Sequence, residues 1–281
     1  MSNFKSIGLF DSGVGGLSVV LEIFKQLPKE NIIYFADIAR QPYGTKTNEE
    51  IENFVLEICR FLEKQKVKLI IIACNTADAF GLTLAQKTFN IPIIGVITPG
   101  AQAAVRDTRN KKIGIIGSKG LINSKAHRKF LKSMNSDIQI FEQPSDPSLV
   151  PFAVEEGKIY TSSTKRLVKE HLYSLQKENV DTIILGSTHY PFLKEVIKEV
   201  IGAKVILIDP AEETVQQAKK LLFAKNLLYN GRKKPIYKFF TSGDPEKFKA
   251  IAEQLIKRKI FFVNKFNLEK ESLQYERTKH N

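Results

Sequence analysis

Short apolar runs alternate along the chain with longer stretches in which apolar residues recur every three or four positions. The runs are SIGLF (6–10), NIIYFAD (31–37), KLIIIAC (68–74), IPIIGVI (91–97), KIGIIG (112–117), DIQIFEQ (137–143), DTIILG (181–186), KVILID (204–209) and, more weakly, IYKFFTS (236–242). Continuous apolar runs, each followed by a helix pattern, are typical of parallel strands buried on both faces. The pattern therefore predicts an α/β fold with mainly parallel sheets flanked by helices, and functional residues at the carboxyl ends of the strands.

The pattern also repeats. SIGLFDSGVGG resembles KIGIIGSKG with Ile7 matching Ile113, an offset of 113 − 7 = 106. LIIIACNT resembles TIILGSTH with an offset of 187 − 74 = 113, and GVITPGAQAAV resembles LIDPAEETVQQA with an offset of 210 − 99 = 111. Three ordered matches at nearly one offset indicate two similar α/β halves, although Ile-rich strands can also resemble each other by chance.

Composition changes this picture little. The chain has 281 residues, of which 43% are hydrophobic, and no apolar run of membrane-spanning length. Its first residues lack a charged segment leading into a long apolar one, so we expect a cytoplasmic protein with no membrane partner. Two cysteines make no disulfide framework, and the four histidines show no metal-ligand spacing with them, so we expect no metal.

The formal net charge of +13 raises the question of nucleic-acid binding. The lysines are spread beside glutamates on predicted helices, as in LKEVIKEVIGAK, rather than concentrated in one segment. We interpret most of them as solvated helix faces and expect no nucleic-acid partner.

Small polar residues follow the predicted strands. They are Asp11 and Ser12, then Pro42, Tyr43 and Gly44, then Cys74, Asn75 and Thr76, and finally Ser187, Thr188 and His189. Because these groups follow strands or begin helices, their backbone N–H groups can hold an anion. Few of the side chains are cationic, which favours carboxylate ligands over polyphosphates.

Cys59 lies in a helical pattern of apolar residues and is interpreted as a core residue, whereas Cys74 stands at a probable helix start, where the helix dipole and free amides favour a thiolate. The GVGG run (13–16) has neither the Lys-Ser/Thr of a P-loop nor the spacing of a dinucleotide site, and we interpret its glycines as allowing a tight strand-to-helix turn.

At these residues the chain resembles the cofactor-independent glutamate racemases of the Asp/Glu racemase family. The matching motifs, between residue 7 and about residue 250, are IGLFDSGVGGLSVV, YFADIARQPYGTK, IIACNTADAF, GVITPGAQAA, VPFAVEEG, ILGSTHYPFL, LIDPAEETV and TSGDPEKF. The resemblance implies two pseudo-symmetric α/β domains with the active site between them, no pyridoxal phosphate or other cofactor, and two cysteines that act as base and acid on opposite faces of glutamate.

Carried over by motif, Cys74 is one catalytic cysteine, assisted by Asp11. His189 and Glu155, rather than Glu156, would assist on the other face. The positions that match substrate-binding residues are Asp11, Ser12, Pro42, Tyr43, Gly44, Cys74, Asn75, Thr76, Thr188 and His189.

Ser187 stands where the family has its second cysteine. A hydroxyl is a far weaker acid than a thiol, so two-base racemisation is in question here. The serine could be introduced deliberately, could belong to a natural enzyme that is slow or relays protons through His189, or could mark a related reaction or a glutamate-binding regulatory protein. PSDPSLVP (144–151), where the family commonly has Cys-Pro, favours natural divergence.

The resemblance also implies the organisation of the chain. We expect a first domain of residues 1–98 plus 210–281, a second of residues 99–209, hinge motion about the two crossings, and a homodimer. The expected activity is interconversion of L- and D-glutamate, supplying D-glutamate for peptidoglycan. The open alternatives are another cofactor-independent racemase, such as one for aspartate, a relative with one working cysteine, and the regulatory binding protein.

Overall fold

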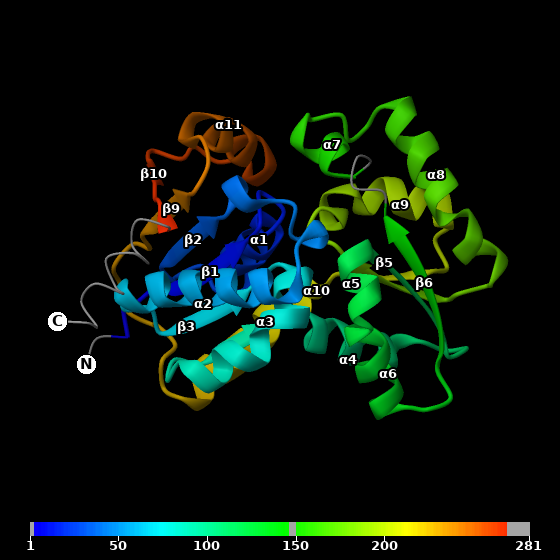
Figure 1. Ribbon diagram of the computed structural model, residues 1–281, viewed down its shortest axis with the longest axis horizontal. Helices are drawn as coiled ribbons and strands as arrows, with labels where there is room; N and C mark the ends of the chain where they lie inside the picture. The colour runs from blue at the N-terminus through cyan, green and yellow to red at the C-terminus, as the bar shows by residue number, and fades with distance from the viewer. Residues whose placement is uncertain (1–2, 146–149, 269–281) are drawn as a thin grey trace.

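The computed structural model describes residues 3–145 and 150–268 and divides their strands between two sheets (Figure 1). The first sheet has the order β10-β9-β2-β1-β3-β4 and the second has the order β6-β5-β7-β8, with every pairing parallel. The strands of the first sheet are β1 (Ile7–Asp11), β2 (Ile32–Ala36), β3 (Leu69–Ile72), β4 (Ile93–Gly95), β9 (Tyr237–Thr241) and β10 (Val263–Lys265). Those of the second sheet are β5 (Lys112–Ser118), β6 (Gln139–Ser145), β7 (Thr182–Gly186) and β8 (Ile206–Ile208).

Helices cover both faces of each sheet, as the continuous apolar runs require. They are α1 (Leu17–Gln26), α2 (Asn48–Lys64), α3 (Asn75–Thr88), α4 (Ile97–Asp107), α5 (Lys119–Ser124), α6 (Ala126–Met134), α7 (Val150–Glu155), α8 (Ser162–Lys177), α9 (Lys194–Ile201), α10 (Pro210–Ala224) and α11 (Pro245–Ile256). Three short 3₁₀ turns are η1 (Ile38–Arg40), η2 (Tyr43–Thr45) and η3 (Tyr190–Leu193). The predicted α/β class is confirmed.

Alternate residues of each central strand pack on opposite faces. In β3, Leu69 and Ile71 join the core under α1 and α10, whereas Ile70 and Ile72 join the core under α2 and α3. In the second sheet, Ile113 and Ile115 of β5 share a core with α4 and α6. Each strand therefore has to be apolar at consecutive positions, which is the pattern seen in the sequence.

The two halves have the same strand order. The order β2-β1-β3-β4 in the first half is matched by β6-β5-β7-β8 in the second. Ile7 pairs with Ile32 and Leu69 on its two sides, and Ile113 pairs in the same way with Ile140 and Thr182. The sequence repeat therefore corresponds to two equivalent four-stranded units, and the first unit is extended by β9 and β10.

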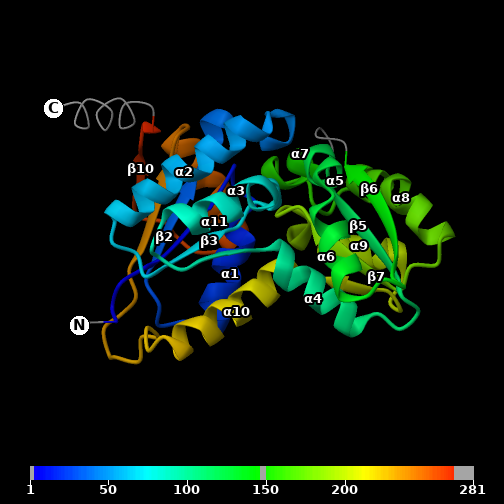
Figure 2. The ribbon, with the colours of Figure 1, turned by 60° about the horizontal axis from the view of Figure 1, so that its bottom comes forward.

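The chain crosses between the two units through α4 and α10, which pack against each other (Figure 2). Ala101, Ala103 and Ala104 of α4 lie in the core of the second unit, and α10 packs on α1 of the first. The first sheet draws its strands from residues 7–95 and 237–265, and the second from residues 112–208. This arrangement supports the expected division near residues 98 and 210, which stays a prediction.

Of the ten strands in the part of the chain that the structure describes, nine coincide with the predicted apolar runs, and β10 does not. Its three residues are partly or fully exposed, and it joins the sheet by backbone pairing with β9 rather than by an apolar run. Among residues 3–145 and 150–268, no helix combines the length and apolar character required to cross a bilayer.

Candidate active site

The carboxyl ends of both sheets open onto one cavity of about 330 Å³. The first unit contributes Ser12, Gln41, Pro42, Tyr43, Gly44, Thr45, Cys74, Asn75 and Thr76, and the second contributes Ser118, Lys119, Ser145, Glu155, Gly186, Ser187, Thr188 and His189. Every residue expected at the site from the sequence lines this cavity except Asp11. A glutamate-sized molecule would contact both units at once.

Cys74 closes the end of β3 and is the N-cap residue of α3. Only 7% of its surface is exposed, and its Sγ lies 3.8 Å from Ser12 Oγ, to which the thiol can donate. Burial, and next the Asp11 carboxylate, raise the thiol pKa to about 12, although amide N–H groups of Ala77 and Thr76 act in the opposite direction. The helix start acts on the thiol in the expected direction, but burial and Asp11 outweigh it, so the net shift of the pKa is upward.

Asp11 lies behind the cavity wall rather than in it. It is fully buried, and it accepts hydrogen bonds from the Gly13 amide at 3.0 Å and from the Thr188 hydroxyl at 3.4 Å. Burial raises the pKa of Asp11, and the opposing effect of His189 is smaller. Asp11 thus acts on Cys74 through its charge and joins the first unit to the loop after β7.

The GVGG run brings its backbone close to side chains of both units. A Cβ atom on Gly15 would stand 2.1 Å from Thr188 Oγ1 and 3.0 Å from a ring carbon of His189. A Cβ atom on Gly16 would stand 2.6 Å from Asp11 Cβ. Neither glycine has a positive φ, so their small size, rather than left-handed backbone freedom, is what this loop uses.

The loop after β7 presents Ser187, Thr188 and His189. Ser187 is half-buried, and its hydroxyl accepts a hydrogen bond of 3.4 Å from the backbone N–H of His189. His189 Nε2 lies 3.3 Å from Glu155 Oε1, while Glu156 pairs with Lys158 instead. The structure therefore sets Glu155, and not Glu156, beside the histidine.

The two corresponding loops lead into different elements. Cys74 leads directly into α3, a helix of 14 residues, whereas Ser187 leads into η3, a 3₁₀ turn of four residues. At Cys74 the start of a long helix opposes the rise in thiol pKa that burial causes. The element after Ser187 is much shorter, so this helix-start effect is weaker there.

Six lining residues were missed from the sequence: Gln41, Thr45, Ser118, Lys119, Ser145 and Gly186. Ser118 could have been found, since the offset of 106 that relates Ile7 to Ile113 also relates Ser12 to residue 12 + 106 = 118. It caps α5, and its hydroxyl lies 3.1 Å from that of Thr76. Gln41 lies between the turns η1 and η2, and Lys119 is the first residue of α5.

Two observations concern the ligands that the cavity could hold. The Asn75 Oδ1 atom is buried and has no hydrogen-bond partner in the structure, so it can accept a hydrogen bond from a ligand. Among the residues that the structure describes, no three His, Cys, Asp or Glu side chains gather as a metal site would require. Residues 146–149 of PSDPSLVP lie outside the described residues.

Comparison with known proteins gives one consistent result. The family model described as Asp/Glu/Hydantoin racemase matches residues 7–218. A glutamate racemase of Oceanobacillus iheyensis is 43% identical over 259 residues, which cover 92% of this chain and 93% of that protein.

Solved structures agree with the sequence comparison. The crystal structure of a glutamate racemase isoform from Bacillus anthracis superposes with a TM-score of 0.90 at 40% identity, covering 95% of this chain and 98% of that one. A glutamate racemase from Francisella tularensis, solved in complex with D-glutamate, gives a TM-score of 0.87 at 36% identity and covers 95% of this chain and 99% of that one.

Proposed function

The chain belongs to the Asp/Glu/hydantoin racemase family, and we propose on that basis that it is a glutamate racemase, which interconverts L- and D-glutamate without a cofactor. The observation that carries the proposal is the position of Cys74 and Ser187. They follow corresponding strands of two equivalent units and line the same cavity. Inverting a carbon centre requires proton removal on one side and delivery on the other, and the two units supply two sides.

Cys74 is the acid/base of the first unit. Because burial and the Asp11 carboxylate raise the pKa of its thiol, the reaction needs a positive charge near it before a thiolate forms. The ammonium group of an amino acid supplies such a charge, and the unpartnered Oδ1 of Asn75 can accept a hydrogen bond from it. Substrate binding and base activation are coupled in this way.

The second unit offers Ser187, with His189 and Glu155 beside it. A serine hydroxyl is a much weaker acid than a thiol, so proton transfer on this face is the slower of the two transfers. His189, held 3.3 Å from Glu155, is the group that can exchange a proton with this face. The geometry therefore supports slow racemisation with rapid proton exchange on the Cys74 face.

The cellular role follows from the product. D-glutamate is a building block of peptidoglycan, so the enzyme would supply cell-wall synthesis from the cytoplasm.

The remaining elements of the proposal are a homodimer, the domain division at residues 98 and 210, and hinge motion about α4 and α10. Support for the last two comes from the packing of these helices between the two units.

Incubation of each enantiomer in deuterated water tests the proposal. We expect deuterium at the α-carbon from both enantiomers, with racemised product, and no exchange in Cys74→Ala. Exchange from one enantiomer without racemisation would mean that Cys74 works alone. Binding without exchange would favour a regulatory binding protein, and turnover of aspartate in preference to glutamate would reassign the substrate.

A further inference from the structure

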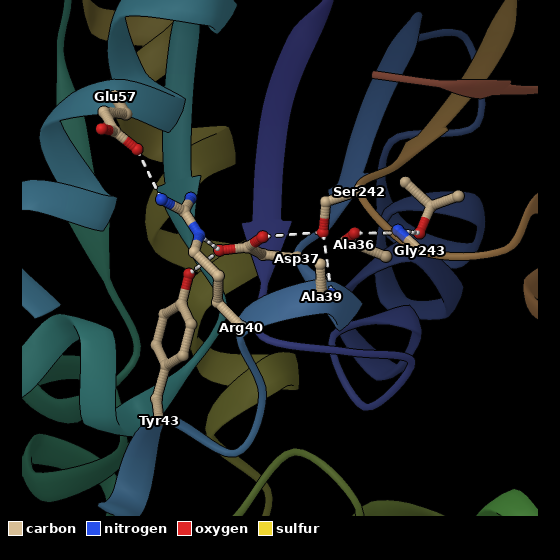
Figure 3. A network of polar contacts seen from close by, with 9 residues as sticks. Ala36, Asp37, Ala39, Arg40, Tyr43, Glu57, Ser242 and Gly243 are labelled. Carbon is tan, nitrogen blue, oxygen red and sulfur yellow. Dashed lines mark hydrogen bonds and ion pairs between the residues drawn. The ribbon is translucent and has the colours of Figure 1, made fainter. Parts of the chain in front are cut away.

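The loop between β2 and α2 is organised around the buried carboxylate of Asp37 (Figure 3). Its Oδ1 accepts a hydrogen bond from the Ser242 hydroxyl at 2.8 Å, and its Oδ2 accepts one from Arg40 Nε at 2.7 Å. The Tyr43 hydroxyl also donates to Oδ2. Asp37 has no exposed surface, so a buried charge is here matched by three donors from three positions of the chain.

Tyr43 is the donor that connects this carboxylate with the cavity. The residue lines the cavity, but only 1% of its surface is exposed and its hydroxyl is directed to Asp37. Burial and the charge of Asp37 raise the pKa of Tyr43 well above its usual value, which keeps the hydroxyl protonated as a donor. What Tyr43 can offer a ligand is therefore its backbone, together with the neighbouring Pro42 and Gly44.

Ser242 connects the same carboxylate with the C-terminal part of the chain. It follows β9, which pairs with β2, and its hydroxyl accepts a hydrogen bond from the Ala39 backbone at 3.0 Å. The adjacent Thr241 donates to the Ala36 carbonyl at 3.1 Å. A segment some 200 residues away in sequence is thus attached to the end of β2 and to the middle of the turn η1 that leads to the cavity wall.

Arg40 is the third donor to the Asp37 carboxylate. Its guanidinium bonds Asp37 and Glu57 of α2, and its Cζ lies 4.0 Å from the centre of the Phe54 ring. The positive charge offsets that of the carboxylate, and the ring fixes the plane of the guanidinium. The cluster formed by Asp37, Arg40, Tyr43, Glu57 and Ser242 is called the Asp37 cluster below.

We propose that Asp37, at the centre of the Asp37 cluster, is a positioning residue for the substrate cavity. Through Tyr43 it holds the wall of residues 42–44, and through Ser242 it fixes that wall to the C-terminal strand β9. The inference rests on the proposed function, since it assigns a role in glutamate binding to residues that do not touch the ligand. It gives Ser242 of TSGDPEKF, which lies far from every cavity-lining residue in sequence, a role at the same site.

The test uses Asp37→Asn, Tyr43→Phe, Ser242→Ala and the double variant Asp37→Asn/Tyr43→Phe in the full chain. We expect each single variant to raise KM for glutamate about three- to thirty-fold, as expected for loss of a hydrogen bond to a charged group, with kcat changed less than about three-fold. The double variant should lose little more than Asp37→Asn alone, because both changes break one contact.

A matched control is Asp181→Asn. Asp181 directly precedes β7, at the amino end of that strand and away from the cavity, and accepts hydrogen bonds from Thr108, Thr182 and the backbone of residues 109 and 110. It should lower Tm without raising KM. Hydrogen exchange of residues 41–46 supplies a readout without substrate: it should accelerate in Asp37→Asn and Ser242→Ala and stay unchanged in Asp181→Asn.

The outcomes separate the two proposals. If the unaltered protein neither binds nor turns over glutamate, the proposed function is overturned, while hydrogen exchange still tests the positioning role. If the unaltered protein is active, and Asp37→Asn changes neither KM nor exchange in residues 41–46, or changes them no more than Asp181→Asn does, the positioning role is overturned.

Discussion

The hydroxyl oxygens of Thr76 and Ser118 lie 3.1 Å apart and join the two units across the cavity. Thr76 stands in the first turn of α3, and Ser118 caps α5. Both residues line the cavity. In the proposed hinge motion this bond would form when the units close, so it would contribute to closure as well as to ligand contact.

Thr76→Val, which removes this hydroxyl and keeps the shape of the side chain, should raise KM for glutamate about two- to tenfold, because one hydrogen bond across the closed cavity is lost. Steady-state kinetics with both enantiomers measure the change. Thr88→Val, an exposed position at the other end of α3, is the control and should leave KM unaltered. An equal effect of the two substitutions would argue against a role in closure.

Ser187→Cys should raise the racemisation rate by roughly 10²-fold, because a thiol replaces a much weaker acid at the second face and general acid–base catalysis contributes gains of this size. The rate is followed by circular dichroism of each enantiomer. Ser187→Ala is the matched control: it should be slower than the unaltered protein if the hydroxyl takes part in proton transfer. No gain from the cysteine would show that residue 187 does not limit the reaction.

The sequence predicted the strands well, because burial on both faces makes β3 apolar throughout and leaves only Asp11 at the end of β1 and Thr182 at the start of β7 as polar residues in those two strands. It predicted less about side-chain direction. Asp11 was expected in the cavity but lies behind it, as the buried last residue of β1, while Ser12, in the bend that follows the strand, lines it. The motif gave the right loop but not which of two adjacent residues faces the ligand.

The state of Cys74 could not be predicted for a different reason. The sequence shows a cysteine at a helix start, where the thiolate is favoured. The burial of the thiol, and the charge of Asp11 from another strand, appear only after the fold is formed, and together they outweigh the helix start. Gln41 was missed because its approach to the cavity depends on the conformation of the loop between η1 and η2.

Asp11→Asn should make Cys74 more reactive in the absence of substrate. Removing the carboxylate removes the second cause of the raised thiol pKa, and at pH 8 the thiolate fraction rises about tenfold for each unit by which that pKa falls. Alkylation by iodoacetamide, located by mass spectrometry, measures the rate at this residue. Cys59, whose pKa is raised by burial in α2, is the internal control and should stay unreactive. Slower alkylation of Cys74 in this variant would contradict the electrostatic account.

Asp78 predicts a pH dependence of stability. The residue lies in α3, is buried, and its Oδ2 accepts hydrogen bonds from the backbone N–H groups of Val96 and Ile97, at 2.6 and 2.7 Å, where α4 begins. Burial raises its pKa to about 7, despite these two bonds. Because an unfolded aspartate titrates near 3.8, the folded protein holds the proton more tightly. The stabilisation from protonation is complete below that value and is lost as the pH rises through about 7.

Asp78→Asn, which keeps an acceptor for the two N–H groups and cannot ionise, removes this dependence. The free energy of unfolding of the variant relative to the unaltered protein should therefore increase between pH 4 and pH 8, by on the order of 4 kcal/mol at most. Chemical denaturation across this range measures it. Asp137→Asn is the control of opposite sign, because Lys111 lowers the pKa of Asp137 and the substitution can only lose stability as the pH rises. If the two proteins differed in free energy of unfolding by an amount that is constant with pH, Asp78 would stay ionised while it accepts the two hydrogen bonds from the start of α4.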